Sequence, residues 1–151
     1  MTTTLPTGVS QAAKTLHRVY GEETLQQQAT VTFSNFPLDD QLIDIFEHCS
    51  NAGWEGENSV PVDTRTLMVA RKLVEALPRE YRTPTISGEP DGHVCLEWYV
   101  TTRRILTVSV NPNGTLHWAA LIGDEDPRGS CHFYDEAPST LLYWIGRVCN
   151  K

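Results

Sequence analysis

From residue 93 onward, apolar and polar side chains alternate with a period of two residues, and this alternation constrains the fold more than any other feature. The period is typical of a β-strand with one buried face, because successive side chains of a strand point to opposite faces of the sheet. Two runs precede the turn sequence Asn111–Gly114, and a third run, Leu116–Ile122, follows it. The apolar members of the first two runs are Val94, Leu96, Trp98, Val100, Leu106, Val108 and Val110. With a further short strand expected at Ser130–Tyr134, the sequence predicts a four-stranded antiparallel β-meander.

Helical signals precede and follow this predicted sheet. Asp63 is a good N-cap for a helix that ends near Pro78. An earlier helix is expected to be capped by Asp39 or Asp40, and a last helix is expected to begin near Ser139. The apolar stripe of the earlier helix is predicted to comprise Leu42, Ile43, Phe46 and Cys49. The stripe of the last helix, expected to cover one sheet face, comprises Leu141, Leu142, Ile145 and Val148.

The order of these signals predicts an α+β fold: N-terminal helices, the four-stranded antiparallel meander, and a C-terminal helix packed on the sheet. A chain of 151 residues is long enough to bury one ordinary core. We expect residues 1–36 to form an N-terminal arm or small helical element, and residues 37–151 to form a single α+β domain.

The charge and the cysteine content limit the classes of partner and the cellular compartment that we expect for this chain. The formal net charge of −7 gives no overall attraction to nucleic acid or to anionic lipid. The N-terminus lacks the features of a secretory signal, and no apolar run approaches the roughly 20 residues that span a bilayer. The four cysteines have no Cys-x-x-Cys spacing, so we expect them to be reduced. A cytoplasmic protein with no direct nucleic-acid or membrane partner is predicted.

Three short motifs carry a resemblance to other proteins. They are G-W-x-G at Gly53–Gly56, D-G-x-x-x-L-E-W at Asp91–Trp98, and the pair of segments Ser109–Gly114 and Leu116–Gly123. On these motifs, the stretch 53–148 resembles a group of small uncharacterised bacterial proteins of unassigned function. Those proteins often carry Asp and Tyr around G-W-x-G, where this chain has Glu55 and Glu57, and they more often have Tyr in place of Trp118. The resemblance implies a small accessory protein encoded beside a larger partner, and it assigns no catalytic residue.

Sequence motifs for catalysis are missing. The chain contains no Gly-x-Ser-x-Gly elbow, no phosphate-binding Gly-x-x-x-x-Gly-Lys loop and no Gly-x-Gly-x-x-Gly fingerprint. Carboxylates that could act as acid and base, or hold a cation, are interpreted as solvated loop residues. These are Glu97, Asp124, Glu125, Asp126, Asp135 and Glu136. No catalytic residue and no cofactor is therefore predicted.

A metal site is the most specific alternative to a chain without catalytic chemistry. His93, Cys95 and Glu97 share one strand face, because side chains two residues apart point the same way. His117 and the pair Cys131–His132 could add ligands from neighbouring strands. The competing interpretation is a solvated polar face, and we expect no metal. The corresponding enzyme hypothesis is a small metal-dependent hydrolase that uses Glu97, His93, His117 and His132.

The residues most suggestive of function are aromatic and acidic side chains near loops and strand ends. Trp54 lies between two glycines, where it either plugs the domain's own core or anchors a partner. If the helices cover the Trp98 face, Tyr99 and His117 lie on a partly open sheet face. The acidic loop from Asp124 would attract a basic surface. The predicted partner-binding residues are Trp54, Glu55, Glu57, Tyr99, His117, Asp124, Glu125 and Asp126.

Together these patterns favour a non-catalytic protein that binds and inhibits or modulates a larger cytoplasmic protein with a basic surface. An antitoxin, an immunity protein or a phage anti-defence protein would be of this type. A homodimer formed through the sheet face or the C-terminal helix is a third possibility.

Overall fold

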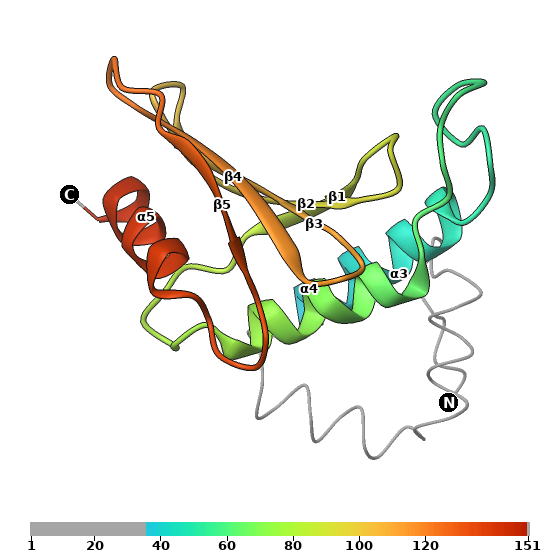
Figure 1. Cartoon of the computed structure of the whole chain (residues 1–151), viewed down its shortest axis with the longest axis horizontal. Coiled ribbons are helices and arrows are strands. Elements are labelled where there is room, and N and C mark those ends of the chain that lie inside the picture. The colour runs from blue at the N-terminus through green and yellow to red at the C-terminus, as the bar shows by residue number, and fades with distance from the viewer. Residues whose placement is uncertain (1–35, 151) are drawn as a thin grey trace, which may run out of the picture.

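The computed structural model describes residues 36–150, in which three helices and five strands follow one another (Figure 1). The elements are α3 (Phe36–Cys49), α4 (Thr64–Ala76), β1 (Thr85–Gly88), β2 (Val94–Thr101), β3 (Arg104–Val110), β4 (Thr115–Ile122), β5 (Arg128–His132) and α5 (Ser139–Cys149). The predicted N-terminal arm, residues 1–36, lies outside the described residues except for its last position. Within the described part, no helix has the length and apolar character needed to cross a bilayer.

The sheet is an antiparallel meander in the order β1-β2-β3-β4-β5. The predicted α+β class and meander are confirmed, but the predicted number of four strands is wrong. The additional strand, β1, contains only four residues, which is too short for a period of two residues to stand out in the sequence. The last strand also spans Arg128–His132 rather than the predicted Ser130–Tyr134.

One face of the sheet is buried under the helices. The side chains of Val94, Leu96 and Leu106 have no exposed surface, and Trp98 is 1 % exposed. The α5 helix contacts β2, β3 and β4, the α4 helix contacts β2 and β3, and the α3 helix packs against β1. Figure 1 shows α4 and α5 below the sheet, with α3 beside α4. The buried residues of helices and strands form a single core cluster.

The predicted caps and buried faces of the helices are partly confirmed. Asp63 caps α4 as expected, because its carboxylate accepts a hydrogen bond from Arg65 N–H at 2.8 Å. The predicted cap of the preceding helix is wrong, since Asp39 lies inside the first turn of α3. The predicted stripe of α3 is also partly wrong: Phe46 is 46 % exposed, and Ile45 is buried in its place. The α5 helix buries Leu141, Ile145 and Val148, as predicted.

The two edges of the sheet differ. At the β1 edge, the side-chain oxygen of Gln41 in α3 accepts a hydrogen bond from the backbone N–H of Ile86 at 2.7 Å. The outer side of β1 is therefore covered by a helix. The β5 strand forms the opposite edge, and its residues are exposed except for the half-buried Cys131.

Candidate functional site

The face of the sheet opposite the helices is open in the described part of the chain. Strand register places Cys95, Ser109, His117 and Ser130 in one row across this face, and Glu97, Thr107, Ala119 and Arg128 in the next row. A shallow depression of about 470 Å³ crosses these rows. It is lined by Glu89, Cys95, Thr107, Ser109, His117, Trp118, Ala119, Arg128, Gly129 and Ser130. The open face is therefore hollowed, and most of the residues that line the depression carry a polar group.

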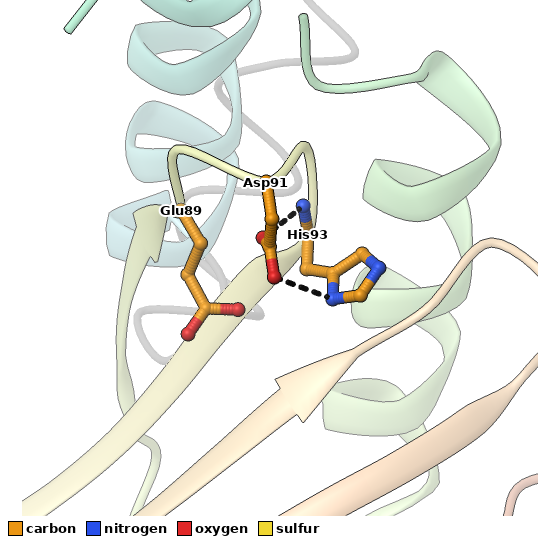
Figure 2. Close-up of side chains that lie close together, drawn as sticks. All are labelled: Glu89, Asp91 and His93. Atoms are coloured by element: carbon orange, nitrogen blue, oxygen red, sulfur yellow. Dashed lines mark hydrogen bonds and ion pairs between the residues drawn. The ribbon is translucent and has the colours of Figure 1, made fainter. Parts of the chain in front are cut away.

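A compact cluster of polar side chains stands at one end of this face, on the turn between β1 and β2 (Figure 2). The turn is closed by a hydrogen bond from Glu89 N–H to the carbonyl of His93 at 2.9 Å. Asp91 stabilises it by accepting from His93 N–H at 3.1 Å. Gly92 has a φ of +88°, and a Cβ there would lie 3.0 Å from the carbonyl oxygen of Pro61. A tight turn held against the α3–α4 loop thus positions Glu89, Asp91 and His93.

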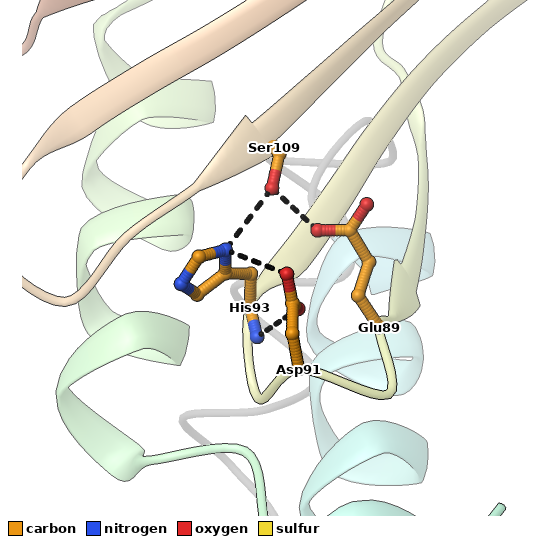
Figure 3. Close-up of polar contacts among 4 residues, drawn as sticks. All are labelled: Glu89, Asp91, His93 and Ser109. Carbon is orange, nitrogen blue, oxygen red and sulfur yellow. Dashed lines mark hydrogen bonds and ion pairs between the residues drawn. The ribbon is translucent and has the colours of Figure 1, made fainter. Parts of the chain in front are cut away.

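The side chains of this turn meet Ser109 of β3 (Figure 3). The hydroxyl of Ser109 donates to Oε2 of Glu89 at 2.5 Å and lies 3.4 Å from Nδ1 of His93. The same Nδ1 lies 3.2 Å from Oδ2 of Asp91. The contact between Ser109 and Glu89 joins residues that are 20 positions apart in the sequence.

These four residues do not have the geometry of a serine–histidine–aspartate triad. In a triad the histidine uses one ring nitrogen for the carboxylate and the other for the serine hydroxyl. Here Asp91 and Ser109 both face Nδ1 of His93, and a neutral ring nitrogen either donates or accepts but cannot do both. Because the Ser109 proton is directed to Glu89, this arrangement does not activate Ser109 through His93.

The turn could hold a divalent cation. One potential ligand atom from each of Glu89, Asp91 and His93 lies within 4.8 Å of the others, and within the described residues no other group of three such side chains is this close. Ligand atoms of a tetrahedral zinc ion are about 3.4 Å apart, so small side-chain movements would suffice. Binding through Nδ1 would require the ring proton to move to Nε2.

The structure does not gather the metal ligands suggested by the sequence. His93 joins Glu89 and Asp91, whereas Cys95 and Glu97 are not part of that group. His117 lines the depression, and His132 packs against Tyr134 with ring centroids 4.3 Å apart. The predicted set of His93, Glu97, His117 and His132 therefore does not form one cluster.

Burial makes the thiol of Cys95 a poor nucleophile and a poor ligand. Desolvation raises the pKa of Cys95 to about 11, and the nearby carboxylates of Glu89 and Glu97 act in the same direction. Because the thiolate is the reactive and metal-binding form, Cys95 stays protonated at neutral pH. All four cysteines are free, as the sequence predicts.

Trp54 is engaged by its own domain. Its indole N–H donates to the carbonyl of Val60 at 2.9 Å, and its ring packs against the core beside Gly88. Its neighbours Glu55 and Glu57 are exposed. Of the two interpretations given by the sequence, the contacts of Trp54 match a plug that fixes the α3–α4 loop against β1.

The other predicted partner-binding residues divide between the open face and the β4–β5 turn. Tyr99 is 49 % exposed, and His117 is also exposed on this face. The three acids of the turn each contact an arginine: Asp124 with Arg103 at 2.6 Å, Asp126 with Arg128 at 3.1 Å and Glu125 with Arg147 at 3.8 Å. The turn lies beside the β2–β3 turn, whereas the α3–α4 loop lies beside the β1–β2 turn at the other end of the sheet (Figure 1). The two acidic segments therefore do not form one patch.

Sequence reasoning missed Glu89 and Asp91 as members of a cluster. Asp91–Gly92 has the composition of a turn, and that interpretation is correct but incomplete. The available signal was the spacing Glu-x-Asp-x-His, which places carboxylates and an imidazole within one tight turn. Ser109 could join them only through the register of β2 and β3.

No family model, curated protein or solved structure matches the chain. The resemblance drawn from the three short motifs stays a prediction.

Proposed function

We propose that this chain is a non-catalytic protein-binding module that inhibits or modulates a larger cytoplasmic protein. The observation that carries this proposal is the half-open sheet: Trp98 is buried under the helices, whereas Tyr99, His117 and Ala119 are exposed on the opposite face. Binding measurements on variants of this face distinguish a binding surface from a face that is only solvated. Antitoxins, immunity proteins and phage anti-defence proteins act in this way.

The charge of the open face favours a basic partner surface. Glu89 and Glu97 lie on this side, with Asp91 at its end, while the cationic Arg128 is already paired with Asp126. The net charge of −7 also attracts a basic partner before the two proteins are in contact. Such complementarity raises the association rate and disfavours acidic partners.

We expect an arginine in the middle of the open face to weaken partner binding. Ala119→Arg places a long cation where the side chain is exposed and unpacked, so it should obstruct a basic partner without affecting the core. Met68→Arg, on the exposed surface of α4, is the matched control because Met68 is 54 % exposed. The partner would be isolated with the native protein, identified by mass spectrometry, and its affinity for each purified variant measured by calorimetry.

The expected result is at least about tenfold weaker binding by Ala119→Arg and unchanged binding by Met68→Arg. Equal affinity of both variants for the partner would show that the open face is not the binding surface. Circular dichroism would confirm that each variant is folded.

A second candidate function is a metal-dependent hydrolase, and the turn at Glu89, Asp91 and His93 is the observation that favours it. These three groups stand beside the depression on the open face, which Glu89 also lines. A cation held by three protein ligands retains a position for water, as in catalytic zinc sites. The ion would polarise that water, and the depression would receive the substrate.

Metal binding is expected to depend on the charge of Asp91. Asp91→Asn keeps a side-chain oxygen for the hydrogen bond from His93 N–H but removes the anionic ligand. Untagged, chelator-treated protein would be titrated with Zn²⁺ in a calorimeter, with Glu97→Gln as a control outside the cluster. Wild type and Glu97→Gln should bind equally, and Asp91→Asn at least about tenfold more weakly. Failure of the wild type to bind Zn²⁺ would remove this second candidate.

A further inference from the structure

The outer edge of β5 presents backbone groups that have no partner among the described residues. The inner side of β5 pairs with β4. Just before the paired residues, Ala120 N–H donates a hydrogen bond to the carbonyl of Pro127 at 2.8 Å. Just after them, Phe133 N–H donates to the carbonyl of Gly114 at 2.9 Å. Backbone groups alternate in direction along an antiparallel strand. Arg128, Ser130 and His132 therefore turn their N–H and C=O groups away from β4.

These outward groups are free within the part of the chain that the structure describes. No hydrogen bond there reaches the backbone of Arg128, Ser130 or His132 from outside the ladder. The register irregularity of the sheet lies in β2, near Tyr99, and the β4–β5 pairing is regular. Proteins protect an edge with a short strand, a charged side chain, a proline, a bulge or a covering helix. The β5 strand is short and carries the exposed Arg128, but no helix covers it among the described residues. The β1 edge has such a cover from Gln41.

We propose that β5 binds an extended, lysine- or arginine-bearing segment of a partner protein, which adds to the sheet as a further strand. In this mode of recognition, backbone hydrogen bonds supply affinity and flanking side chains supply specificity. The inference rests on the proposed function, because it specifies which part of the binding module contacts the partner.

The charged residues near β5 favour one kind of binding partner for this edge over another. The acidic turn Asp124–Asp126 precedes β5, but each of its acids is paired with an arginine. The exposed Asp135 and Glu136, which follow β5, have no ion pair within the described residues. A second copy paired antiparallel about Ser130 would place Arg128 of each copy opposite His132 of the other. The arginines beside the turn Asp124–Asp126 are already paired, so a second copy brings no free arginine to Asp135 and Glu136. A segment that carries a lysine or arginine beyond its strand residues supplies that cation, so it fits this edge better than a second copy.

An exposed aromatic side chain provides an anchor beside the edge. Tyr134 is 78 % exposed, and its ring contacts the ring of His132 at the end of β5. Tyrosine contributes strongly to protein interfaces because it buries a large area and has few rotatable bonds. A bound strand would cover Tyr134 as it passes Asp135 and Glu136.

The proposal is tested with the end-blocked peptide Lys-Val-Thr-Val-Thr-Val-Lys and a matched peptide that has glutamate in place of both lysines. The lysine peptide should bind the full-length chain and slow amide hydrogen exchange at Arg128, Ser130 and His132. The glutamate peptide should bind at least about tenfold more weakly, and the difference should shrink as salt is added. Equal binding of the two peptides would overturn the proposal.

Ser130→Pro and Ser130→Ala form the decisive pair of variants. Proline removes an outward N–H but no bond to β4, and it is tolerated in an edge strand where that group faces solvent. Ser130→Pro should reduce affinity for the lysine peptide at least about tenfold, while Ser130→Ala should leave it unchanged. If circular dichroism shows that Ser130→Pro is unfolded, the double variant Asp135→Lys and Glu136→Lys replaces it. This variant should reverse the preference between the two peptides.

Two other outcomes would also overturn the proposal. A wild-type dimer that becomes monomeric with Ser130→Pro in sedimentation would show that the edge takes a second copy. Loss of the native partner with Ala119→Arg but not with Ser130→Pro would leave the proposed function standing and place the partner on the open face instead of the β5 edge. Failure of the proposed function itself is distinguished by the wild-type chain, which would then co-purify with no partner protein.

Discussion

Replacing Trp98 with alanine is expected to lower the free energy of unfolding by about 3–5 kcal/mol, because the indole is buried in the centre of the core. Its exposed fraction is 1 %, and its N–H donates to the carbonyl of Arg82 at 2.6 Å. The change therefore leaves a large cavity and an unpaired carbonyl. Urea denaturation followed by far-ultraviolet circular dichroism measures the loss.

Tyr99 provides the matched control for this experiment. It is the next residue of the same strand, but its side chain is 49 % exposed on the open face. Tyr99→Ala should change the free energy of unfolding by less than about 0.5–1 kcal/mol. A similar loss for both variants would mean that the two faces of the sheet are equally buried, contrary to the structure.

A methyl group at position 129 is expected to destabilise the chain by about 1–3 kcal/mol through overpacking. A Cβ on Gly129 would lie 2.7 Å from Cζ2 and 3.0 Å from Cε2 of Trp118. The indole cannot move away freely, because Trp144 of α5 stacks against it with centroids 5.0 Å apart. Gly129→Ala should therefore displace β5 from β4, and Ser130→Ala, on the other face of β5, should have little effect. Denaturation of the two variants measures this difference.

A double-mutant cycle tests whether Trp118 is the cause. In a Trp118→Leu background, Gly129→Ala should lose most of its effect, which gives a coupling energy of about 1 kcal/mol or more. An undiminished loss in that background would assign the effect to the backbone of residue 129 instead.

The sequence predicts the centre of the sheet well and its margins poorly. The segments that contain Leu96 and Val108 are long enough for alternation to define both strand and face, and the structure confirms both. The short strand at Ile86 is held by pairing with β2 and by Gln41, which is 45 residues away. Neither contact leaves a local pattern. The shifted bounds of β5 have a similar cause, since the packing of Gly129 against Trp118 depends on tertiary structure.

The candidate site was predicted only in part. Alternation correctly placed Tyr99 and His117 on the less buried face, because the direction of a side chain in a strand is a local property. The meeting of Glu89 with Ser109 depends on strand register, which a single sequence does not specify. Whether the acidic turn at Asp124 lies near Trp54 also depends on which turns share an end of the sheet, and this is not a local property of the sequence. The structure separates the acidic turn at Asp124 from that tryptophan.

The hydrogen bond between Gln41 and Ile86 has a consequence for assembly. Filament growth by sheet extension requires every subunit to offer two complementary edges, so that each new copy leaves a site for the next. In this chain the α3 helix occupies one of those edges. The β5 strand of one copy therefore cannot add to the β1 edge of another copy. Pairing through β5 can join two copies at most. Among the described residues only the β5 edge is uncovered, and a single uncovered edge does not provide the second edge that a fibre needs.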